Sequence, residues 1–203
     1  MVKVLPIKYE ETKDWLLNVH YMRRMPPMNY AFGLFDDDVC LGIVTFGVPA
    51  SPNLCEGICG KEWKYNVFEL NRMCFVEPIK NGPSRLVSGA IKMLPKPMII
   101  VSYADTEYGH VGKVYQACNF IYTGLSAKRN NYVDGTDRHA REIQKTDQMV
   151  ERSRKHRYVY INANKREKKI IMSALKYPIE SYPQGTPERY EINHKPITQG
   201  SLL

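Results

Sequence analysis

Side chains that can exchange protons are densest in the stretch SYADTEYGHVGKVYQACNFIYTG. Within 20 residues it carries Tyr103, Asp105, His110, Tyr115, Asn119 and Tyr122. Asp105 follows an apolar run of buried-strand type, and ligands gather at the carboxyl ends of such strands in α/β sheets. In a small cleft, His110 could act as a general base and Tyr115 as a general acid. The alternative is structural, with the histidine capping a helix and the tyrosine packing in the core.

The start of a helix offers a second kind of site, one for anions. The strand-like segment VFELNRMCF is followed by KNGPSRLVSG, where Pro83 fits the first turn of a helix. Unpaired N–H groups and the positive dipole end of that turn attract phosphates. We expect Asn81, Gly82, Ser84 and Arg85 to hold a pyrophosphate. Alternatively, Ser84 only caps the helix.

The pair His20-Tyr21, followed by two arginines, is a third candidate. It could equally be a surface helix end where cations suit the dipole. His20, Asp105 and His110 are conceivable ligands of divalent iron, because imidazole and carboxylate suit that ion, but their spacing does not establish a site. Cys55 and Cys59 supply only half of a zinc site, so we do not expect structural zinc.

The elements that must position these residues follow from periodicity and turn residues. We expect, in order, a helix over 9–24, a hairpin of strands 30–35 and 39–47, a long loop over 48–65, a strand 67–76, a helix 81–94, a strand 98–103, a short helix 110–118 and a strand 120–122. With a strand ahead of the first helix, the element order is β, α, β, β, β, α, β, α, β. This order predicts one mixed α/β domain.

Composition narrows the class of protein. The chain has 203 residues, of which 43% are hydrophobic and 25% charged, enough for one domain with a core and an extension. No apolar run is long enough to span a membrane, and the first residues are too polar for a secretory signal. Five cysteines without disulfide spacing are expected to be reduced thiols. We therefore expect a cytoplasmic protein with no membrane contact.

Positive charge is concentrated in one segment. Residues 1–127 carry 13 Lys and Arg against 12 Asp and Glu, whereas residues 128–169 carry 13 against 6, a net charge of +7. We divide the chain into a catalytic domain, 1–127, and a basic, partly helical extension, 128–203, that packs on the domain. Lys155 and Arg157 are expected to make phosphate contacts independent of base sequence. The alternative is a solvated helical face.

The order of elements, with VFELNRMCF and VYQACNFIYTG, resembles the GNAT acyltransferase fold. That resemblance implies a mainly antiparallel central sheet flanked by helices. It also implies that two central strands separate to admit acyl-CoA, with its pyrophosphate on the following helix. Tyr115, in YQACNF, stands where such enzymes often have the tyrosine that protonates the departing CoA thiolate.

Six motifs together resemble the phage Mom family of DNA adenine-modifying proteins. They are HYMRRMP, FGVPAS, ELNRM, NGPS, SYADTEYGHVGKVYQACNFIYTG and KHRYVY, spread over about residues 19–160, and the long block is the most specific. The resemblance implies a carbamoylmethyl-type group on adenine N6, which shields phage DNA from host restriction. The cofactor it implies is acetyl-CoA or a related acyl donor, and it leaves open whether divalent iron takes part. The site residues it implies are His20, Tyr21, Ser84, Asp105, His110, Tyr115 and Asn119.

Double-stranded DNA is the expected partner. Adenine N6 is a weak nucleophile, so Asp105 or His110 would remove its proton, and the base would be flipped out of the duplex. The residues expected to contact the base or the DNA are His20, Tyr21, Arg72, Tyr103, Lys155 and Arg157. Two rivals remain, namely a GNAT enzyme acting on a protein or small amine, and a non-catalytic DNA-binding protein. The sequence leaves open whether the chain is a monomer or a homodimer.

Overall fold

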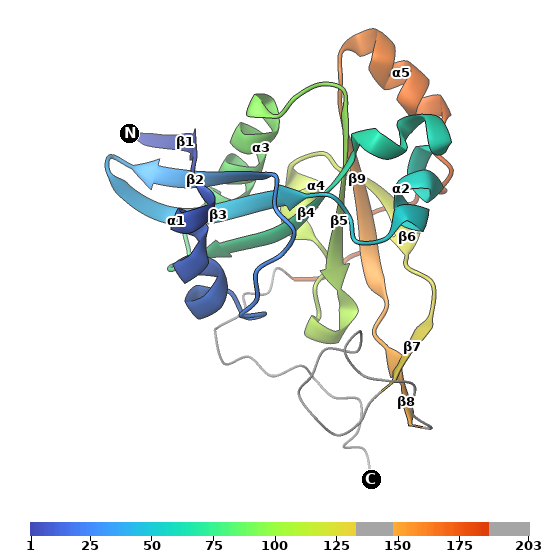
Figure 1. The fold of residues 1–203 in the computed structure, drawn as a ribbon, viewed down its shortest axis with the longest axis horizontal. Helices are drawn as coiled ribbons and strands as arrows, with labels where there is room; N and C mark the ends of the chain where they lie inside the picture. The colour runs from blue at the N-terminus through green and yellow to red at the C-terminus, as the bar shows by residue number, and fades with distance from the viewer. Residues whose placement is uncertain (133–147, 187–203) are drawn as a thin grey trace.

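The computed structural model describes residues 1–132 and 148–186, and within them a seven-stranded sheet forms the body of the molecule (Figure 1). The strands of the main sheet are β1 (Val2–Pro6), β2 (Tyr30–Asp36), β3 (Val39–Gly47), β4 (Val67–Phe75), β5 (Met98–Asp105), β6 (Ile121–Leu125) and β9 (Lys155–Asn162). A separate ribbon consists of β7 (Arg129–Tyr132) and β8 (Met149–Arg152). No helix in the described ranges is long and apolar enough to cross a membrane.

Helices and helical turns connect these strands. They are α1 (Tyr9–Asp14), the π-helical turn η1 (Trp15–Val19), α2 (Pro52–Cys59), the 3-10 helix η2 (Lys61–Asn66), α3 (Gly82–Met93), the 3-10 turn η3 (Thr106–Tyr108), α4 (Lys113–Ala117) and α5 (Lys165–Ser173). The strand order is β1-β2-β3-β4-β5-β9-β6, and every neighbouring pair is antiparallel except β4 and β5. The predicted fold class, a mixed α/β fold with a mainly antiparallel sheet, is confirmed.

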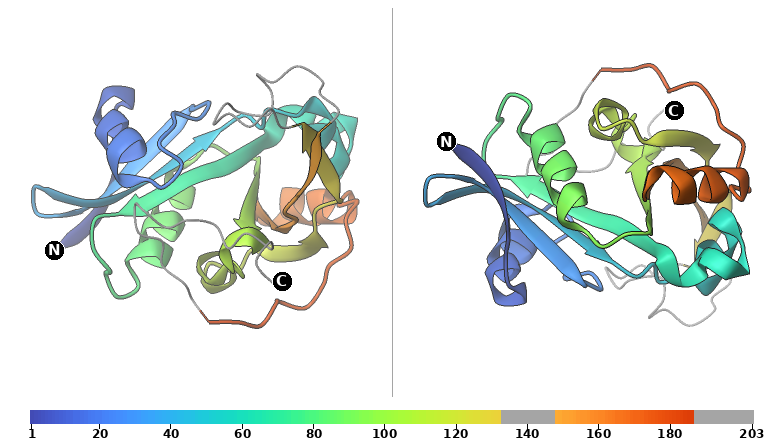
Figure 2. Two further views of the ribbon diagram at one scale, coloured as in Figure 1. Left: turned by 90° about the horizontal axis from the view of Figure 1, so that it is seen from below. Right: turned by 90° about the horizontal axis from the view of Figure 1, so that it is seen from above.

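Helices cover both faces of the sheet. On one face, α3 and α4 pack on a core that includes Leu86, Ile91, Phe46 and Phe120. On the other, α2 and α5 close a second core around Ile58 and the middle of β5. Figure 2 shows α1 and α3 on opposite sides of the sheet. The sheet is therefore a central layer with helices on both of its faces.

Strands β4 and β5 separate at the middle of the sheet. They pair in parallel only over Val67–Glu69 and Ile99–Val101, although β4 continues to Phe75 and β5 to Asp105. Past this point β4 stays with β3 and β5 stays with β9. An opening therefore forms between the carboxyl-terminal halves of two neighbouring strands, as the GNAT resemblance implied.

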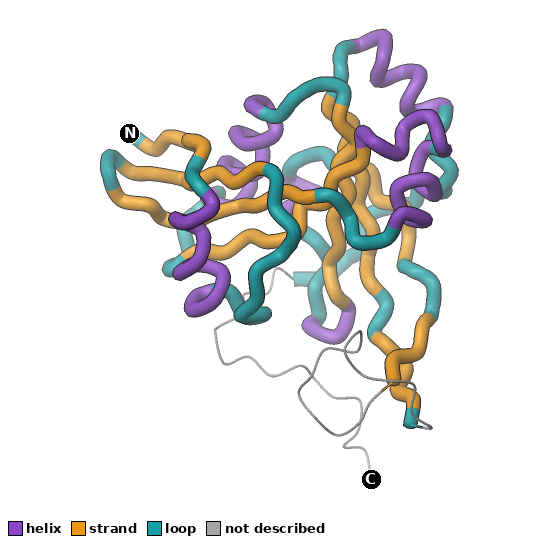
Figure 3. Tube along the Cα trace, viewed as in Figure 1, coloured by secondary structure: helices purple, strands orange, loops and turns teal. Residues whose placement is uncertain are grey.

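Strand β9 departs from the predicted division of the chain at residue 127. It lies inside the main sheet, paired with β5 along Met98–Asp105 and with β6 on its other side (Figure 3). Val159 and Ile161 are buried in the second core, so this part of the basic segment is core strand rather than extension. The Lys and Arg residues in and around β9 interrupt the alternation of apolar and polar residues that would have indicated a strand. Among the described residues after 127, the helical part of the prediction corresponds to α5; residues 133–147 and 187–203 lie outside the described ranges.

Two local predictions were also wrong. The helix expected over 9–24 ends at Val19, because the turn at its end brings His20 into extended backbone. The expected loop over 48–65 contains α2 and η2. Ser51 accepts a hydrogen bond from the Leu54 N–H and Pro52 begins α2, which is a good helix start despite the Pro- and Gly-rich composition.

Candidate active site

The opening between β4 and β5 is bridged by a buried hydroxyl. Ser102 on β5 donates a hydrogen bond to the Leu70 carbonyl of β4 at 3.0 Å. Tyr115 of α4 reaches the same point, because Ser102 is in polar contact with its hydroxyl. Burial raises the pKa of Tyr115, and the contact with Ser102 offsets part of that rise. Tyr115 is therefore a neutral hydroxyl that can donate a proton at the opening.

Local geometry fixes the ring of Tyr115. Gly112 precedes α4 with φ of 69°, and a Cβ there would come within 3.0 Å of the Tyr115 ring and closer still to Tyr158. Only glycine fits this left-handed and crowded position. The Tyr115 ring packs against Phe120 and Tyr158, with centroids 5.5 and 5.3 Å away. The short helix thus holds one side chain in one orientation.

On the α1 face, the π-helical turn places His20. The His20 N–H donates to the Trp15 carbonyl at 2.8 Å, five residues back, and the chain then turns into extended backbone. The His20 side chain is 5% exposed, and its Nδ1 accepts a hydrogen bond from the Met22 N–H at 3.1 Å. Burial, assisted by Arg72, lowers the pKa of His20 to about 3. The ring is therefore neutral with its proton on Nε2.

Aromatic rings gather beside His20. Tyr21 stacks on His20 with centroids 4.5 Å apart, and Tyr108 of η3 lies 5.2 Å from Tyr21. Burial raises the pKa of Tyr21 to about 12, helped by Tyr108 and Tyr115. The influence of Tyr115 shows that the cluster extends to the opening. A group of rings at this place offers a stacking surface for a planar, aromatic substrate.

Arg72 adds a cation to the same cluster. A register shift in the β3–β4 pairing leaves Asn71 as an extra residue in β4, held by hydrogen bonds from Thr45 and to the Pro27 carbonyl. Arg72 Nη1 donates to the Asn71 carbonyl at 2.6 Å, whereas its Nε is buried without a hydrogen-bond partner in the described part of the chain. Burial lowers the pKa of Arg72. A buried donor of this kind indicates a missing acceptor.

Glu69 is a residue that the sequence reasoning missed. It is the last residue of β4 that pairs with β5, so it lies where the strands separate. Its charge raises the pKa of Tyr103 and of Tyr115, so the carboxylate acts electrostatically on both tyrosines. The sequence signal was the glutamate of VFELNRM, a charged residue in an otherwise apolar strand. Charged groups in such positions often have a functional role.

Asp105, predicted as a proton acceptor, has its oxygens engaged. Lys155 Nζ lies 2.7 Å from Oδ2, and the Ser153 hydroxyl and the Glu107 N–H both donate to Oδ1. Burial acts to raise the pKa of Asp105, but the hydrogen bonds from Lys155 and Ser153 outweigh it, and the pKa lies below its ordinary value. Asp105 therefore joins the end of β5 to the start of β9 through Lys155 and Ser153, and we call these three residues the Asp105 clamp.

The predicted iron ligands do not converge. His110 follows η3, and its N–H donates to the Asp105 carbonyl at 3.1 Å. His20 is on the other side of the aromatic cluster, with Nδ1 occupied by Met22. Among residues 1–132 and 148–186, no three His, Cys, Asp or Glu side chains form a group that could hold a metal ion. Asn119, an exposed residue with φ of 59°, lies in the turn between α4 and β6 and not in the opening.

Two predicted DNA contacts have other roles in the structure. Arg157 is 9% exposed, donates from Nε and Nη2 to Thr123, and stacks on Tyr177 with its guanidinium carbon 3.4 Å from the ring centroid. This buried position does not fit the predicted phosphate contact. Lys155 is engaged with Asp105. Tyr103, in contrast, lies near the opening, where burial and then Glu69 raise its pKa.

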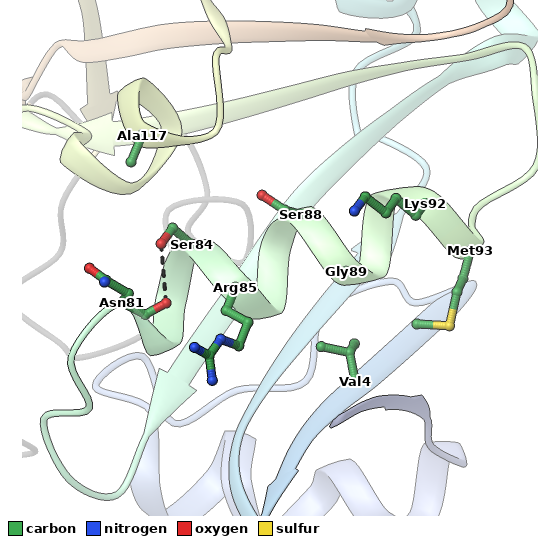
Figure 4. Close-up of a pocket in the computed structure, with 9 residues that line it drawn as sticks. All are labelled: Val4, Asn81, Ser84, Arg85, Ser88, Gly89, Lys92, Met93 and Ala117. Carbon is green, nitrogen blue, oxygen red and sulfur yellow. Dashed lines mark hydrogen bonds between the residues drawn. The ribbon is translucent and has the colours of Figure 1, made fainter. Parts of the chain in front are cut away.

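A groove of about 630 Å³ follows α3 on the opposite face (Figure 4). Its lining includes Asn81, Ser84, Arg85, Ser88 and Lys92. Figure 4 shows Ser84, Ser88 and Lys92 on the side of α3 that faces α4. The Ser84 hydroxyl donates to the Asn81 carbonyl at 3.1 Å, so it stabilises the first helical turn as the structural alternative predicted.

The groove suits a ligand that carries phosphates. At the helix start, the Gly82 N–H is bonded to the Ile79 carbonyl and Pro83 has no N–H, so few backbone donors point outward. Two cationic side chains, Arg85 and Lys92, supply the positive charge instead. We conclude that an anion here would be held by side chains and by the helix dipole more than by a backbone cradle.

Comparison with known proteins supplies the family. The model of the Mom protein family matches residues 1–184. The chain belongs to the Mom protein family. It is 30% identical over 170 residues, which is 78% of this chain and 68% of the relative, to the methylcarbamoylase Mom of Escherichia phage Mu. The Mom match spans both sides of residue 127, in agreement with the position of β9 in the sheet.

Solved acetyltransferases are also similar to this Mom-family chain. A Bacillus subtilis acetyltransferase in complex with CoA is 15% identical, with a TM-score of 0.46 over 79% of this chain and 99% of that one. A putative acetyltransferase from Salmonella typhimurium with acetyl-CoA is 9% identical, with a TM-score of 0.47 over 80% and 95%. An N-acetyltransferase from Staphylococcus aureus Mu50 is 15% identical, with a TM-score of 0.48 over 80% and 99%.

Proposed function

We propose that this chain modifies adenine N6 in double-stranded phage DNA, in the cytoplasm of the host cell, with a group of the carbamoylmethyl type that protects the DNA from restriction. Membership of the Mom family and the name of the phage Mu relative support the class of reaction. The observation that carries the proposal is the opening between β4 and β5. An aromatic and cationic cluster reaches it from one face and a groove with cationic side chains runs along the other.

The target adenine approaches from the α1 face. Flipping a base out of the duplex costs a few kcal/mol, which contacts in the pocket must offset. Tyr21 and Tyr108 offer ring surfaces, and the neutral His20 has an Nε2–H to donate to a ring nitrogen. The buried Nε of Arg72 is a second donor for an acceptor on the substrate. These four residues would orient N6 toward the opening.

The donor approaches from the α3 face. Arg85 and Lys92 would hold the phosphates of acetyl-CoA or a related donor in the groove, and Ser88 would border its path. Acyl transfer from acetyl-CoA itself, with loss of the CoA thiolate, would leave an amide on N6. A carbamoylmethyl product therefore needs a related donor whose methylene carbon bears the leaving sulfur atom. The residues fit this role because the groove runs from the N-terminus of α3 alongside α4, the helix that carries Tyr115.

Two residues would move protons at the opening. As the bond between N6 and the donor carbon forms, the bond from that carbon to its leaving atom breaks with its electron pair. N6 loses one proton and the leaving atom gains one. Glu69, at the point where β4 and β5 separate, would accept the first proton, and the neutral Tyr115 hydroxyl would supply the second. Asp105 would act through position, by holding η3 and Tyr108.

Mass spectrometry of nucleosides tests the proposal. Plasmid DNA would be isolated from cells expressing wild type, Tyr115→Phe or Tyr65→Phe. The last is a matched control, since Tyr65 is 83% exposed on η2. We expect a modified deoxyadenosine with wild type and the control, and a loss of about 10²-fold or more with Tyr115→Phe. The adduct mass also separates an amide from a group joined through a methylene.

Other outcomes favour the rival functions. Unmodified DNA in all samples, with soluble protein and acylation of a peptide library, would identify a GNAT enzyme acting on amines. Equal amounts of modified deoxyadenosine with wild type and with Tyr115→Phe would show that the Tyr115 hydroxyl takes no part in the reaction.

A further inference from the structure

Strands β7 and β8 form a two-stranded ribbon that projects beyond the main sheet. The ribbon emerges beside the carboxyl-terminal end of β5, as Figure 1 shows at the lower right. Its four residue pairs run from Arg129 opposite Arg152 to Tyr132 opposite Met149. All four residues of β8 are exposed, including Met149 at 56% and Val150 at 55%. Such a ribbon lacks a core of its own, so its surface must serve another purpose.

The charges of the ribbon are arranged unfavourably for an isolated hairpin. Arg129 and Arg152 are directly opposite each other, both exposed, and like charges in this position destabilise a strand pair. No described carboxylate forms an ion pair with either of them. The neighbouring Glu151 pairs instead with Lys128, at 3.4 Å. A partner with negative charge would remove the repulsion.

The base of the ribbon is fastened to the candidate active site. Directly after β8, the Ser153 hydroxyl donates to Asp105 at 2.6 Å. The Arg154 carbonyl accepts hydrogen bonds from both the N–H and the hydroxyl of Thr106, the first residue of η3. Arg129 is near enough to lower the pKa of Tyr103. The ribbon is therefore held in a fixed relation to the aromatic cluster.

We propose that the Arg129/Arg152 face of this ribbon binds the phosphates that border a groove of double-stranded DNA and so places the target adenine over the opening. The inference rests on the proposed function for the identity of the reaction, but the surface itself is argued from charge and position. A two-stranded ribbon fits the major groove of B-DNA, where adenine N6 is displayed. The exposed Val150, which lies two residues before Arg152 and therefore on the same face, would lie against the sugar and base edges.

Salt dependence of binding tests the proposal. The double variant Arg129→Gln/Arg152→Gln removes two charges, and Lys165→Gln/Lys169→Gln removes two exposed charges from α5 as a matched control. Binding to a duplex containing adenine would be measured at several salt concentrations. Each lost phosphate contact lowers the slope of log K against log salt by about 0.9. We expect the slope to fall by about 1.8 for the ribbon variant and to stay unchanged for the control.

A charge reversal separates a DNA contact from a structural role. Arg152→Glu would form a favourable cross-strand pair with Arg129, so the ribbon should be as stable as in wild type or more so. DNA affinity should nevertheless fall at least as far as in the double Gln variant. A lower thermal midpoint that accompanies the loss of affinity would overturn the proposal.

Failure of this proposal is distinguishable from failure of the proposed function. If wild type modifies DNA and the ribbon variants keep the wild-type slope, the ribbon is not the contact and the function stands. If wild type binds duplex DNA with a slope that the ribbon variants lose, but no nucleoside is modified, the ribbon is the contact and the reaction is another one.

Discussion

Burial decides the protonation state of His20, and with it the chemistry that this residue can perform. With its pKa at about 3, the imidazole is uncharged throughout the neutral range. Because Nδ1 accepts from the Met22 N–H, the proton is on Nε2. His20 is consequently a donor of hydrogen bonds and a poor proton acceptor. In the same way, the hydrogen bonds and the ion pair at the oxygens of Asp105 make it a poor base.

The depressed pKa of His20 has a consequence for stability. In the unfolded chain, the histidine has a pKa of 6.5 and binds a proton below that pH. In the folded chain, His20 binds the proton only when the pH falls to about 3. The contribution of the neutral His20 to the free energy of unfolding is therefore complete above pH 6.5. It decreases as the pH falls below that value, by up to about 1.4 kcal/mol per pH unit. Denaturant unfolding of wild type between pH 7 and 4 should show this loss.

The variant His20→Asn isolates that effect, because the asparagine oxygen can still accept from Met22. Its free energy of unfolding should depend less steeply on pH than that of wild type. A residual slope from His156, whose pKa burial also lowers, should be common to both proteins. Equal slopes for the two proteins would show that His20 is not the group responsible.

At the scale of elements, the clamp at Asp105 joins three pieces that are far apart in sequence. Asp105 ends β5, Lys155 begins β9 and Ser153 follows the ribbon. If Asp105 acts by positioning, both Asp105 and Lys155 are required. If Asp105 were a general base, only its own carboxylate would be required. We expect Lys155→Met to lower the modification rate as much as Asp105→Asn does, by about tenfold to a hundredfold, because small displacements of positioning groups have effects of that size. Modification rates of the two variants, measured side by side, provide the check.

Elements with strong local patterns were predictable from sequence. The apolar stripe of α3 and the continuous apolar run of β5 are determined by neighbours in the chain, and both lie where expected. The position of β9 depends on pairing with β5, some 50 residues earlier, and its Lys and Arg residues resembled a surface arm. Arg157 shows the same limit, since only the fold reveals that Thr123 and Tyr177 enclose it.

The candidate site was predictable only in part, for a related reason. Tyr115, His20, Tyr21 and Arg72 were all named from the sequence, and the structure gathers them around one opening. Glu69 was not named, because its importance comes from the place where two strands separate. A separation of strands depends on the whole sheet and has no local signature.

At the scale of the whole molecule, the proposed function would keep the two substrates on opposite faces of the sheet. The base and the DNA would bind on the α1 face and beside the ribbon, whereas the groove along α3 is on the opposite face. The two binding events would then meet at the opening, near Ser102 and Tyr115. Substitutions on one face should change the affinity for one substrate and leave the affinity for the other unchanged.

The double variant Arg85→Gln/Lys92→Gln puts this separation to the test. It removes two cations from the groove, and hydrogen bonds to charged groups contribute about 1.5–3 kcal/mol each, so the KM for a phosphate-bearing donor should rise by about tenfold or more. The Kd for duplex DNA should stay at the wild-type value, as it should for the control Lys8→Gln, an exposed residue directly before α1 that does not line the groove. Steady-state kinetics with varied donor, together with DNA titration, measure both. A parallel loss of affinity for donor and DNA would mean that the two ligands share one face of the sheet.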